Sequence, residues 1–137
     1  MGLILDTSVL IAAERRRQSV LQILKQIQAE HLEVEIGISV VTVAEMTHGA
    51  FRARIASDRQ RHLTFIDRLS SEIAVYPVGL DAAKLLGRIA GEQAARGIAI
   101  SFEDLAIGCT ALHLGFGVAT LNVRHFRLIP DLSVVQF

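Results

Sequence analysis

The stretch Leu3-Ile4-Leu5-Asp6-Thr7-Ser8 decides the fold, because an apolar run ends abruptly in an acid and two hydroxyl residues. A short apolar run of this kind is typical of a buried strand. Open α/β folds bind their ligands at the carboxyl ends of such strands, which is where Asp6 would lie. Taken alone, Asp6 is better explained as a helix cap whose carboxylate accepts backbone N–H bonds. A role in catalysis becomes the better explanation only if the chain brings other carboxylates close to Asp6.

Strand-like and helix-like segments alternate along the rest of the chain. We expect strands at 2–5, 34–38, 73–78, 117–121 and 133–136. We expect helices at 7–13, 20–30, 40–51, 56–70, 81–95 and 104–114, with a turn at 122–126. This order predicts right-handed βαβ crossovers, and therefore a three-layer α/β/α sandwich with a central parallel sheet. No linker or repeat divides the chain, so we expect one domain over residues 1–137.

The composition is that of a globular protein, with 51% hydrophobic and 20% charged residues in a chain of 137. A chain of this length buries a sizeable core without disulfides or structural metals. The formal net charge is zero when the histidines are neutral. There is no strong overall field to attract nucleic acid or membranes, so any binding of a polyanion must come from local patches.

The cysteine content and the N-terminus indicate the compartment. The single cysteine, Cys109, cannot form an internal disulfide and is expected to be a buried structural thiol. No basic segment precedes the first apolar run, so the pattern is not that of a signal peptide. No stretch reaches the length of about 20 apolar residues that a membrane span requires. We therefore expect a cytoplasmic protein with no membrane contact.

Two further acids, Glu45 and Asp104, occur near the ends of expected elements. If strands 2–5, 34–38 and 117–121 are parallel neighbours, both acids lie at the same edge of the sheet as Asp6. Three converging carboxylates repel one another, which raises their pKa values unless a cation lies between them. Carboxylate oxygens suit Mg²⁺ or Mn²⁺, and such ions promote hydrolysis of phosphodiester bonds.

Helix capping is the alternative role for each of these acids. The patterns Thr42-x-x-Glu45 and Ser101-x-x-Asp104 both match a capping box, in which the acid satisfies the start of its own helix. For either acid alone capping is the better explanation, and one residue can serve both purposes. Convergence at one edge of the sheet is what favours a metal site.

Other polar residues are candidates for supporting roles. Asn122 follows strand 117–121 and is either a weak metal ligand or an ordinary turn residue. Ser8 and Thr120 are either hydrogen-bond partners of the acids or caps. Glu103 either supports the site or adds a favourable charge at a helix N-terminus.

Basic residues give weaker indications. Arg124 and Arg127 are well placed, next to Asn122, to contact an RNA strand. Other arginines either line a groove for a phosphate backbone or form a solvated helix face, and the second is the better explanation for most of them: Arg15, Arg16, Arg17, Arg52, Arg54, Arg59, Arg61 and Arg68. The histidines show no ligand spacing and are expected to be surface or packed residues: His31, His48, His62, His113 and His125.

Several separated motifs of the chain resemble the PIN-domain ribonucleases, and most closely the VapC toxins of type II toxin–antitoxin modules. These motifs are Leu5-Asp6-Thr7-Ser8, Ser39-Val40-Val41-Thr42-Val43-Ala44-Glu45, Asp104-Leu105-Ala106-Ile107-Gly108-Cys109-Thr110-Ala111-Leu112 and Ala119-Thr120-Leu121-Asn122-Val123-Arg124-His125-Phe126, followed by Ile129-Pro130. They occur in the family's order and span nearly the whole chain. Any one of them would be a weak signal.

The resemblance implies a PIN-like fold and a Mg²⁺- or Mn²⁺-dependent endoribonuclease. It implies that Asp6, Glu45 and Asp104 are the catalytic, metal-binding acids. It also implies a homodimer that a cognate antitoxin protein holds inactive.

The chain departs from the family pattern in a few positions. Many members carry a fourth acid where this chain has Asn122, or an aspartate where it has His125. Because this chain lacks both acids, a second metal would either bind weakly or need the RNA phosphate as a ligand. Gly108-Cys109 replaces a common Ala-Ala pair, and Asp131 replaces the glycine of Ile-Pro-Gly, which we interpret as a turn variation.

Two other functions compete with the ribonuclease. The incomplete acid set favours a catalytically weak or silent PIN-like module that acts through a partner protein. A phospho-acceptor receiver domain is a fold analogy only. Receivers need a lysine late in the chain, whereas the last lysine here is Lys84, within an expected helix.

Overall fold

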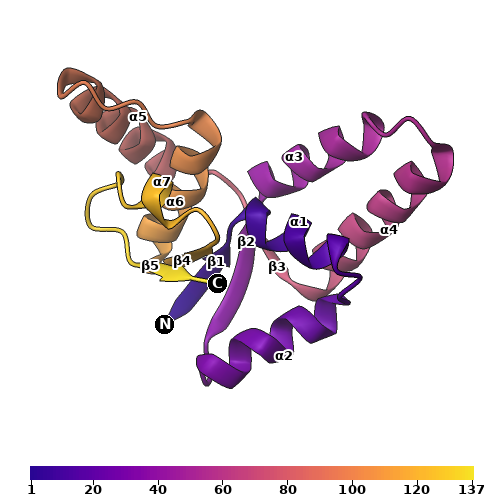
Figure 1. The fold of residues 1–137 in the computed structure, drawn as a ribbon. Helices are drawn as coiled ribbons and strands as arrows, with labels where there is room; N and C mark the ends of the chain where they lie inside the picture. The colour runs from indigo at the N-terminus through magenta and orange to yellow at the C-terminus, as the bar shows by residue number, and fades with distance from the viewer.

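In the computed structural model, which describes residues 1–137, the first apolar run forms the central strand β1 (Gly2–Leu5). Strand β1 pairs in parallel with β2 (Glu35–Ser39) on one side and with β4 (Gly117–Thr120) on the other. Strands β3 (Ala74–Tyr76) and β5 (Val134–Gln136) form the edges, so the order is β3-β2-β1-β4-β5 (Figure 1). Because all the pairs are parallel, the carboxyl ends of β1, β2 and β4 share one edge.

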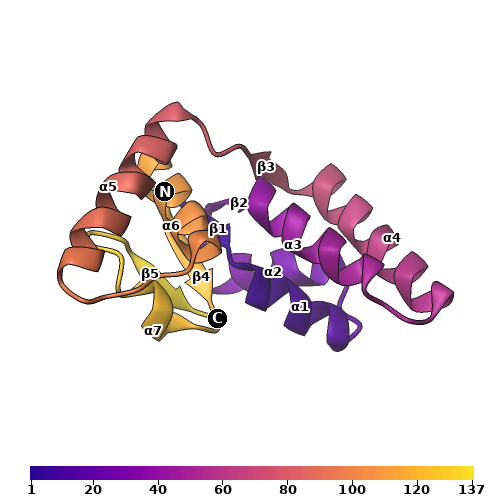
Figure 2. The ribbon, with the colours of Figure 1, turned by 90° about the horizontal axis from the view of Figure 1, so that it is seen from above.

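Helices cover both faces of this sheet, as Figures 1 and 2 show. They are α1 (Thr7–Arg15), α2 (Val20–Glu30), α3 (Val40–Phe51), α4 (Ala56–Glu72), α5 (Leu80–Ala95), α6 (Phe102–Leu114) and α7 (Val123–Phe126). The predicted three-layer α/β/α sandwich with a central parallel sheet is thereby confirmed. The turn predicted at 122–126 is wrong, because residues 123–126 form a short helix that begins after Asn122.

Two hydrophobic cores lie on opposite faces of the sheet. Alternate residues of a strand point to opposite faces, so Leu3 and Leu5 enter one core and Ile4 enters the other. Helices α1 to α4 pack on the first core, and α5 to α7 pack on the second. Strand β1 is buried on both faces, which explains why its sequence is continuously apolar.

Helix α6 is the most deeply buried helix, with every residue from Leu105 to Ala111 buried. Cys109 is among them and has no disulfide partner, as predicted, and burial raises the pKa of its thiol to about 11. The helix ends at Gly115 in the left-handed conformation (φ 71°), which only glycine adopts without cost. Asp131 also has a positive φ of 64°, so the turn variation predicted there is confirmed.

None of the helices combines the length and the apolar character needed to cross a lipid bilayer.

Candidate metal and catalytic site

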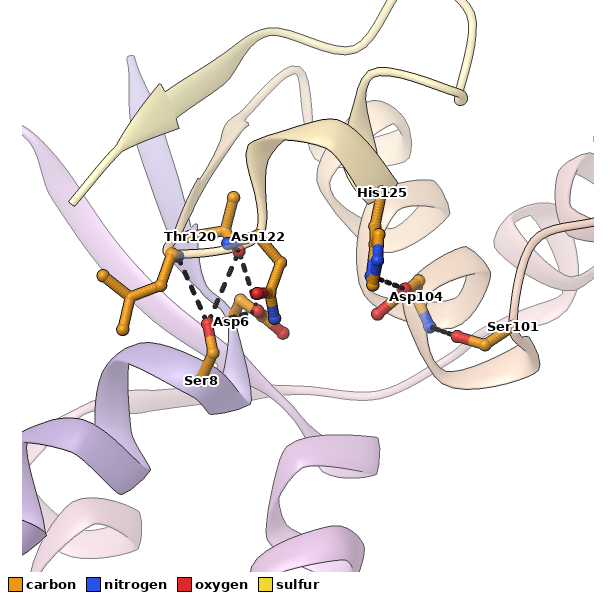
Figure 3. Close-up of polar contacts among 8 residues, drawn as sticks. Asp6, Ser8, Ser101, Asp104, Thr120, Asn122 and His125 are labelled. Carbon is orange, nitrogen blue, oxygen red and sulfur yellow. Dashed lines mark hydrogen bonds and ion pairs between the residues drawn. The ribbon is translucent and has the colours of Figure 1, made fainter.

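Asp6 lies directly after β1 with only 4% of its surface exposed. It occupies the N-cap position of α1, yet its side chain makes no capping hydrogen bond. The hydroxyls of Ser8 and Thr120 instead donate to its Oδ2 atom, over 2.7 Å and 2.8 Å (Figure 3). The capping role considered for the Asp6 carboxylate is therefore wrong. Its Oδ1 atom takes no hydrogen bond and is not fully buried, which leaves it open to a ligand.

Glu45 lies on α3, and it is not part of a helix cap. The N-cap of α3 is Ser39, whose side chain accepts a hydrogen bond from the backbone N–H of Val41. The capping box considered at Thr42-x-x-Glu45 is wrong, because α3 begins at Val40, as expected for helix 40–51, and Thr42 therefore lies inside the helix. Thr42 is instead buried within the helix, and the Thr7 hydroxyl lies 3.0 Å from both Thr42 Oγ1 and Glu45 Oε1.

Asp104 lies in the first turn of α6, at the same edge of the sheet. Its backbone N–H donates to the side chain of Ser101, the N-cap residue, over 3.2 Å. This is one half of the predicted capping box, and the half that would use the Asp104 carboxylate is not formed. The carboxylate faces His125 instead, whose Nδ1 lies 3.6 Å from Oδ2 (Figure 3). Ser101 thus caps the helix with its side chain, and the Asp104 carboxylate takes no part in this cap.

The carboxyl group of Glu45 carries an electrostatic penalty. Burial raises its pKa above the ordinary value, and the hydrogen bond from Thr7 partly opposes this rise. The nearby charges of Asp6, Glu103 and Asp104 raise the pKa further. Carboxylates from four separate positions in the chain therefore act on one another at this edge.

The carboxyl group of Asp104 shows the same pattern. Burial again raises its pKa most, opposed by the hydrogen bond with Ser101. The charges of Asp6 and Glu103 add to the rise, and His125 lowers it. Since Glu103 itself is exposed in the first turn of α6, it contributes charge without being enclosed in the site.

The acids do not form a closed set of metal ligands. No group of three His, Cys, Asp or Glu side chains is arranged to hold a metal ion. The chemistry of the donors nevertheless fits a hard divalent cation, because such an ion binds carboxylate oxygens and relieves their mutual repulsion. Part of the carboxylate set would have to move inward to enclose one.

Hydroxyl groups connect the end of β4 to the acids. The backbone N–H of Asn122 donates to Thr120 Oγ1 over 2.9 Å, and that of Leu121 donates to Ser8 Oγ over 3.3 Å. The predicted roles of Ser8 and Thr120 as hydrogen-bond partners of an acid are confirmed by these contacts with Asp6. Asn122 precedes α7, and its side chain makes no capping bond.

Two surface hollows adjoin the acids. Arg124 and Arg127 are exposed and line the first, of about 470 Å³, together with His125 and Asn122. The second, of about 450 Å³, includes Glu45 and lies between α1, α3 and α4.

The second hollow contains a hydrogen-bonded pair of side chains that the sequence analysis missed. Nδ1 of His62 lies 2.8 Å from both carboxylate oxygens of Glu14. Arg15, Arg17 and Arg61 lie around it, so part of the arginine run adjoins this hollow instead of a purely solvated face. No local spacing links positions 14 and 62, and only the folded structure could reveal the pair.

A family model described as "PIN domain" matches residues 3–131. The chain belongs to the PIN-domain family. This PIN domain is 33% identical over 135 residues to Ribonuclease VapC1 of Rickettsia felis, covering 98% of this chain and 96% of that protein.

Solved structures agree with this assignment. VapBC-1 of nontypeable Haemophilus influenzae is 26% identical, with a TM-score of 0.83 over 99% of this chain and 98% of that chain. VapBC-5 of Mycobacterium tuberculosis, described as a member of the VapBC family of toxin–antitoxin systems, is 26% identical, with a TM-score of 0.73 over 100% of this chain and 98% of that chain. The resemblance of this PIN domain to VapC proteins, predicted from separated motifs, is therefore confirmed.

Proposed function

We propose that this PIN domain is a metal-dependent endoribonuclease and the toxin of a type II toxin–antitoxin module, acting in the cytoplasm. The observation that supports this most is the electrostatic coupling of Asp6, Glu45 and Asp104, which reach one sheet edge from β1, α3 and α6. Such repulsion is a stability cost without a cation, and sites of this kind are usually functional. Over nearly its whole length the chain also resembles a protein named as a ribonuclease.

The cofactor in this proposal is Mg²⁺ or Mn²⁺, held by Asp6, Glu45 and Asp104. A bound ion of this type would activate water and stabilise charge during displacement at a phosphodiester. The protein's own part is to orient the ligands. Ser8 and Thr120 fix one oxygen of Asp6 and leave the other free. Asn122 offers a neutral amide oxygen at the same strand end, a weaker ligand than a fourth acid.

The proposed substrate is RNA, and the proposed partners are a cognate antitoxin and a second copy of the chain. Arg124 and Arg127 supply exposed positive charge beside the acids, which RNA phosphates require in a protein of zero net charge. The antitoxin is supported by the solved structures with the same fold, one of which is described as a toxin–antitoxin system.

A catalytically weak or silent binding module is the second candidate function. It is favoured by one observation, that the acids do not already form a three-ligand group. In this case the domain would act through its partner protein, and the acids would bind Mg²⁺ too weakly to support cleavage.

Cleavage of a labelled RNA, with and without EDTA, distinguishes the two. We expect the wild-type protein to cleave with Mg²⁺ or Mn²⁺, and Asp6→Asn to lose roughly 100-fold or more of this activity. The matched control is Asp67→Asn, which removes an exposed carboxylate on α4 that makes no ion pair. Calorimetry with MgCl₂ should show binding to wild type and not to Asp6→Asn. Activity that survives both EDTA and Asp6→Asn would refute the mechanism, and wild-type protein that neither binds metal nor cleaves would support the binding module.

A further inference from the structure

The hollow beside α7 contains only neutral and basic residues. It lies where β4 ends, α7 begins and β5 reaches the sheet edge, and it has a volume of about 470 Å³. Its polar lining consists of Asn122, Arg124, His125, Arg127 and Gln136. No aspartate or glutamate lines it, although the carboxylate cluster lies next to it.

The two arginines of this hollow have no acidic partner. Arg61, Arg68 and Arg88 each pair with a carboxylate on their own helix, whereas Arg124 and Arg127 form no salt bridge. Both are exposed. A guanidinium group presents several N–H donors in a fixed fork that matches the oxygens of a phosphate. The hollow therefore offers two such groups free to bind an anion.

Contacts on two sides hold this hollow against the acids. Asn122 donates its backbone N–H to Thr120, which in turn donates to Asp6. His125 lies between the arginines in sequence, and its ring nitrogen faces Asp104. Figure 3 shows both connections, with α7 bridging from the end of β4 to the start of α6. An anion bound here would thus lie beside the carboxylates without entering them.

We propose that this hollow binds a phosphate group of the RNA backbone next to the phosphate that is cleaved. The proposal rests on the proposed ribonuclease function, which it makes more specific. The carboxylate cluster repels RNA, and the attraction of two unpaired guanidinium groups offsets this repulsion on one side. The strand would then enter the site from the side of α7.

The hollow next to Glu45 is less suited to a phosphate. It contains two acids, Glu14 and Glu45, and the first of these already binds His62. Its lining also includes the apolar side chains of Ile11 and Met46. Its mixed charge and apolar surface offer less to a phosphate than the acid-free lining around Arg124 and Arg127.

The test is binding of a short fluorescent single-stranded RNA in EDTA, measured by anisotropy at several salt concentrations. Without metal the RNA is not cleaved, so the readout is independent of activity. We expect Arg124→Ala/Arg127→Ala to raise the Kd about tenfold and to reduce the salt slope by roughly 0.7, the value for one phosphate contact. The matched control, Arg52→Ala/Arg54→Ala, removes the same charge at the α3–α4 connection and should leave both quantities unchanged. Thermal unfolding should show that both variants are folded.

Three results would overturn the proposal. One is that Arg124→Ala/Arg127→Ala binds RNA as tightly as the wild-type protein does. Another is an equal loss of RNA affinity in the control variant, which would mean that only total charge matters. The third is tight binding of hexaglutamate that depends on Arg124 and Arg127 while RNA binding does not, which would assign the hollow to a carboxylate of a protein partner.

The two proposals fail separately. Asp6-dependent cleavage with unaltered RNA binding in Arg124→Ala/Arg127→Ala would overturn the phosphate site and support the ribonuclease. Arginine-dependent RNA binding by a wild-type protein that never cleaves would do the reverse.

Discussion

Thr120 donates a hydrogen bond from its Oγ1 atom to Oδ2 of Asp6 across 2.8 Å and 114 positions of sequence. Thr120 is completely buried, and the same oxygen accepts the backbone N–H of Asn122. One hydroxyl therefore fixes both the orientation of the Asp6 carboxylate and the path of the chain after β4. Removing this hydroxyl should therefore disturb both the Asp6 carboxylate and the chain segment after β4.

We expect Thr120→Val to weaken Mg²⁺ binding and RNA cleavage and to destabilise the fold by about 1.5 kcal/mol, the typical value of a hydrogen bond to a charged group. Thr120→Ser is the control, because it keeps the hydroxyl and loses one buried methyl, worth about 0.8 kcal/mol. Calorimetry and urea unfolding measure the two effects. Equal metal affinity in the Val and Ser variants would contradict a role for the hydroxyl.

Raised pKa values make the metal-free protein sensitive to pH. The carboxyls of Glu45 and Asp104 have folded-state pKa values above their ordinary ones, so the folded protein keeps protons that the unfolded chain has released. The stability that these carboxyls contribute is therefore present at low pH and is lost as the pH rises through the raised pKa values. In EDTA at pH 7, we expect Asp104→Asn to melt about 3 °C above wild type.

Two comparisons test whether the stability of the metal-free protein falls as the pH rises. The advantage of Asp104→Asn should shrink as the pH falls and the wild-type carboxyl takes up its proton, and it should reverse in excess Mg²⁺, which stabilises only the wild-type site. Asp67→Asn, on the exposed face of α4, should follow wild type throughout. A melting temperature for Asp104→Asn below that of wild type in EDTA at pH 7 would show that the carboxylates do not strain the fold.

Burial raises the pKa of Glu45, and the hydrogen bond from Thr7 opposes part of this rise. We expect Thr7→Val to raise the pKa of Glu45, and hence to weaken metal binding more at pH 6 than at pH 8. Thr42→Val is the matched control, since it removes the other hydroxyl that Thr7 contacts but none that bonds to Glu45. Carbon NMR of the Glu45 carboxyl during a pH titration reports the pKa directly. Equal shifts of the Glu45 pKa in Thr7→Val and Thr42→Val would contradict this role of Thr7.

Gly108 of α6 leaves room for Ile129. A Cβ atom added at Gly108 would clash with Cδ1 of Ile129. We expect Gly108→Ala to destabilise the fold by roughly 1–3 kcal/mol, as overpacking does. Ile129→Val removes that carbon, so the double variant should recover about 1 kcal/mol of the loss in a double-mutant cycle of urea unfolding. Strictly additive effects would show that the two positions do not compete for this space.

The fold was largely predictable from the sequence because its signals are local. The apolar run before Asp6 and the buried helix after Asp104 are patterns of neighbouring residues, and helices 20–30 and 40–51 were predicted with their observed bounds. The convergence of three strand ends followed from parallel topology. The capping box at Thr42 was wrong because Ser39, at the end of β2, is an equally good cap one turn earlier.

Contacts between distant side chains were not predictable in the same way. The pairs Glu14–His62 and Asp104–His125 depend on how helices pack, and histidine spacing in the sequence carries no sign of them. His125 lies within α7, which follows β4, and only the folded structure places its ring beside Asp104. The geometry that the acids adopt around a metal stays a prediction.

The central place of β1 also fixes the order of events during synthesis. Its neighbour β4 consists of residues 117–120, so a growing chain of about one hundred residues contains Asp6 and Glu45 but neither Asp104 nor Thr120. Pairing between strands this far apart in sequence is a late step of folding. Most of the polypeptide is therefore synthesised before the cluster of acids is complete, and the mutual repulsion of the carboxylates arises only in a nearly full-length chain.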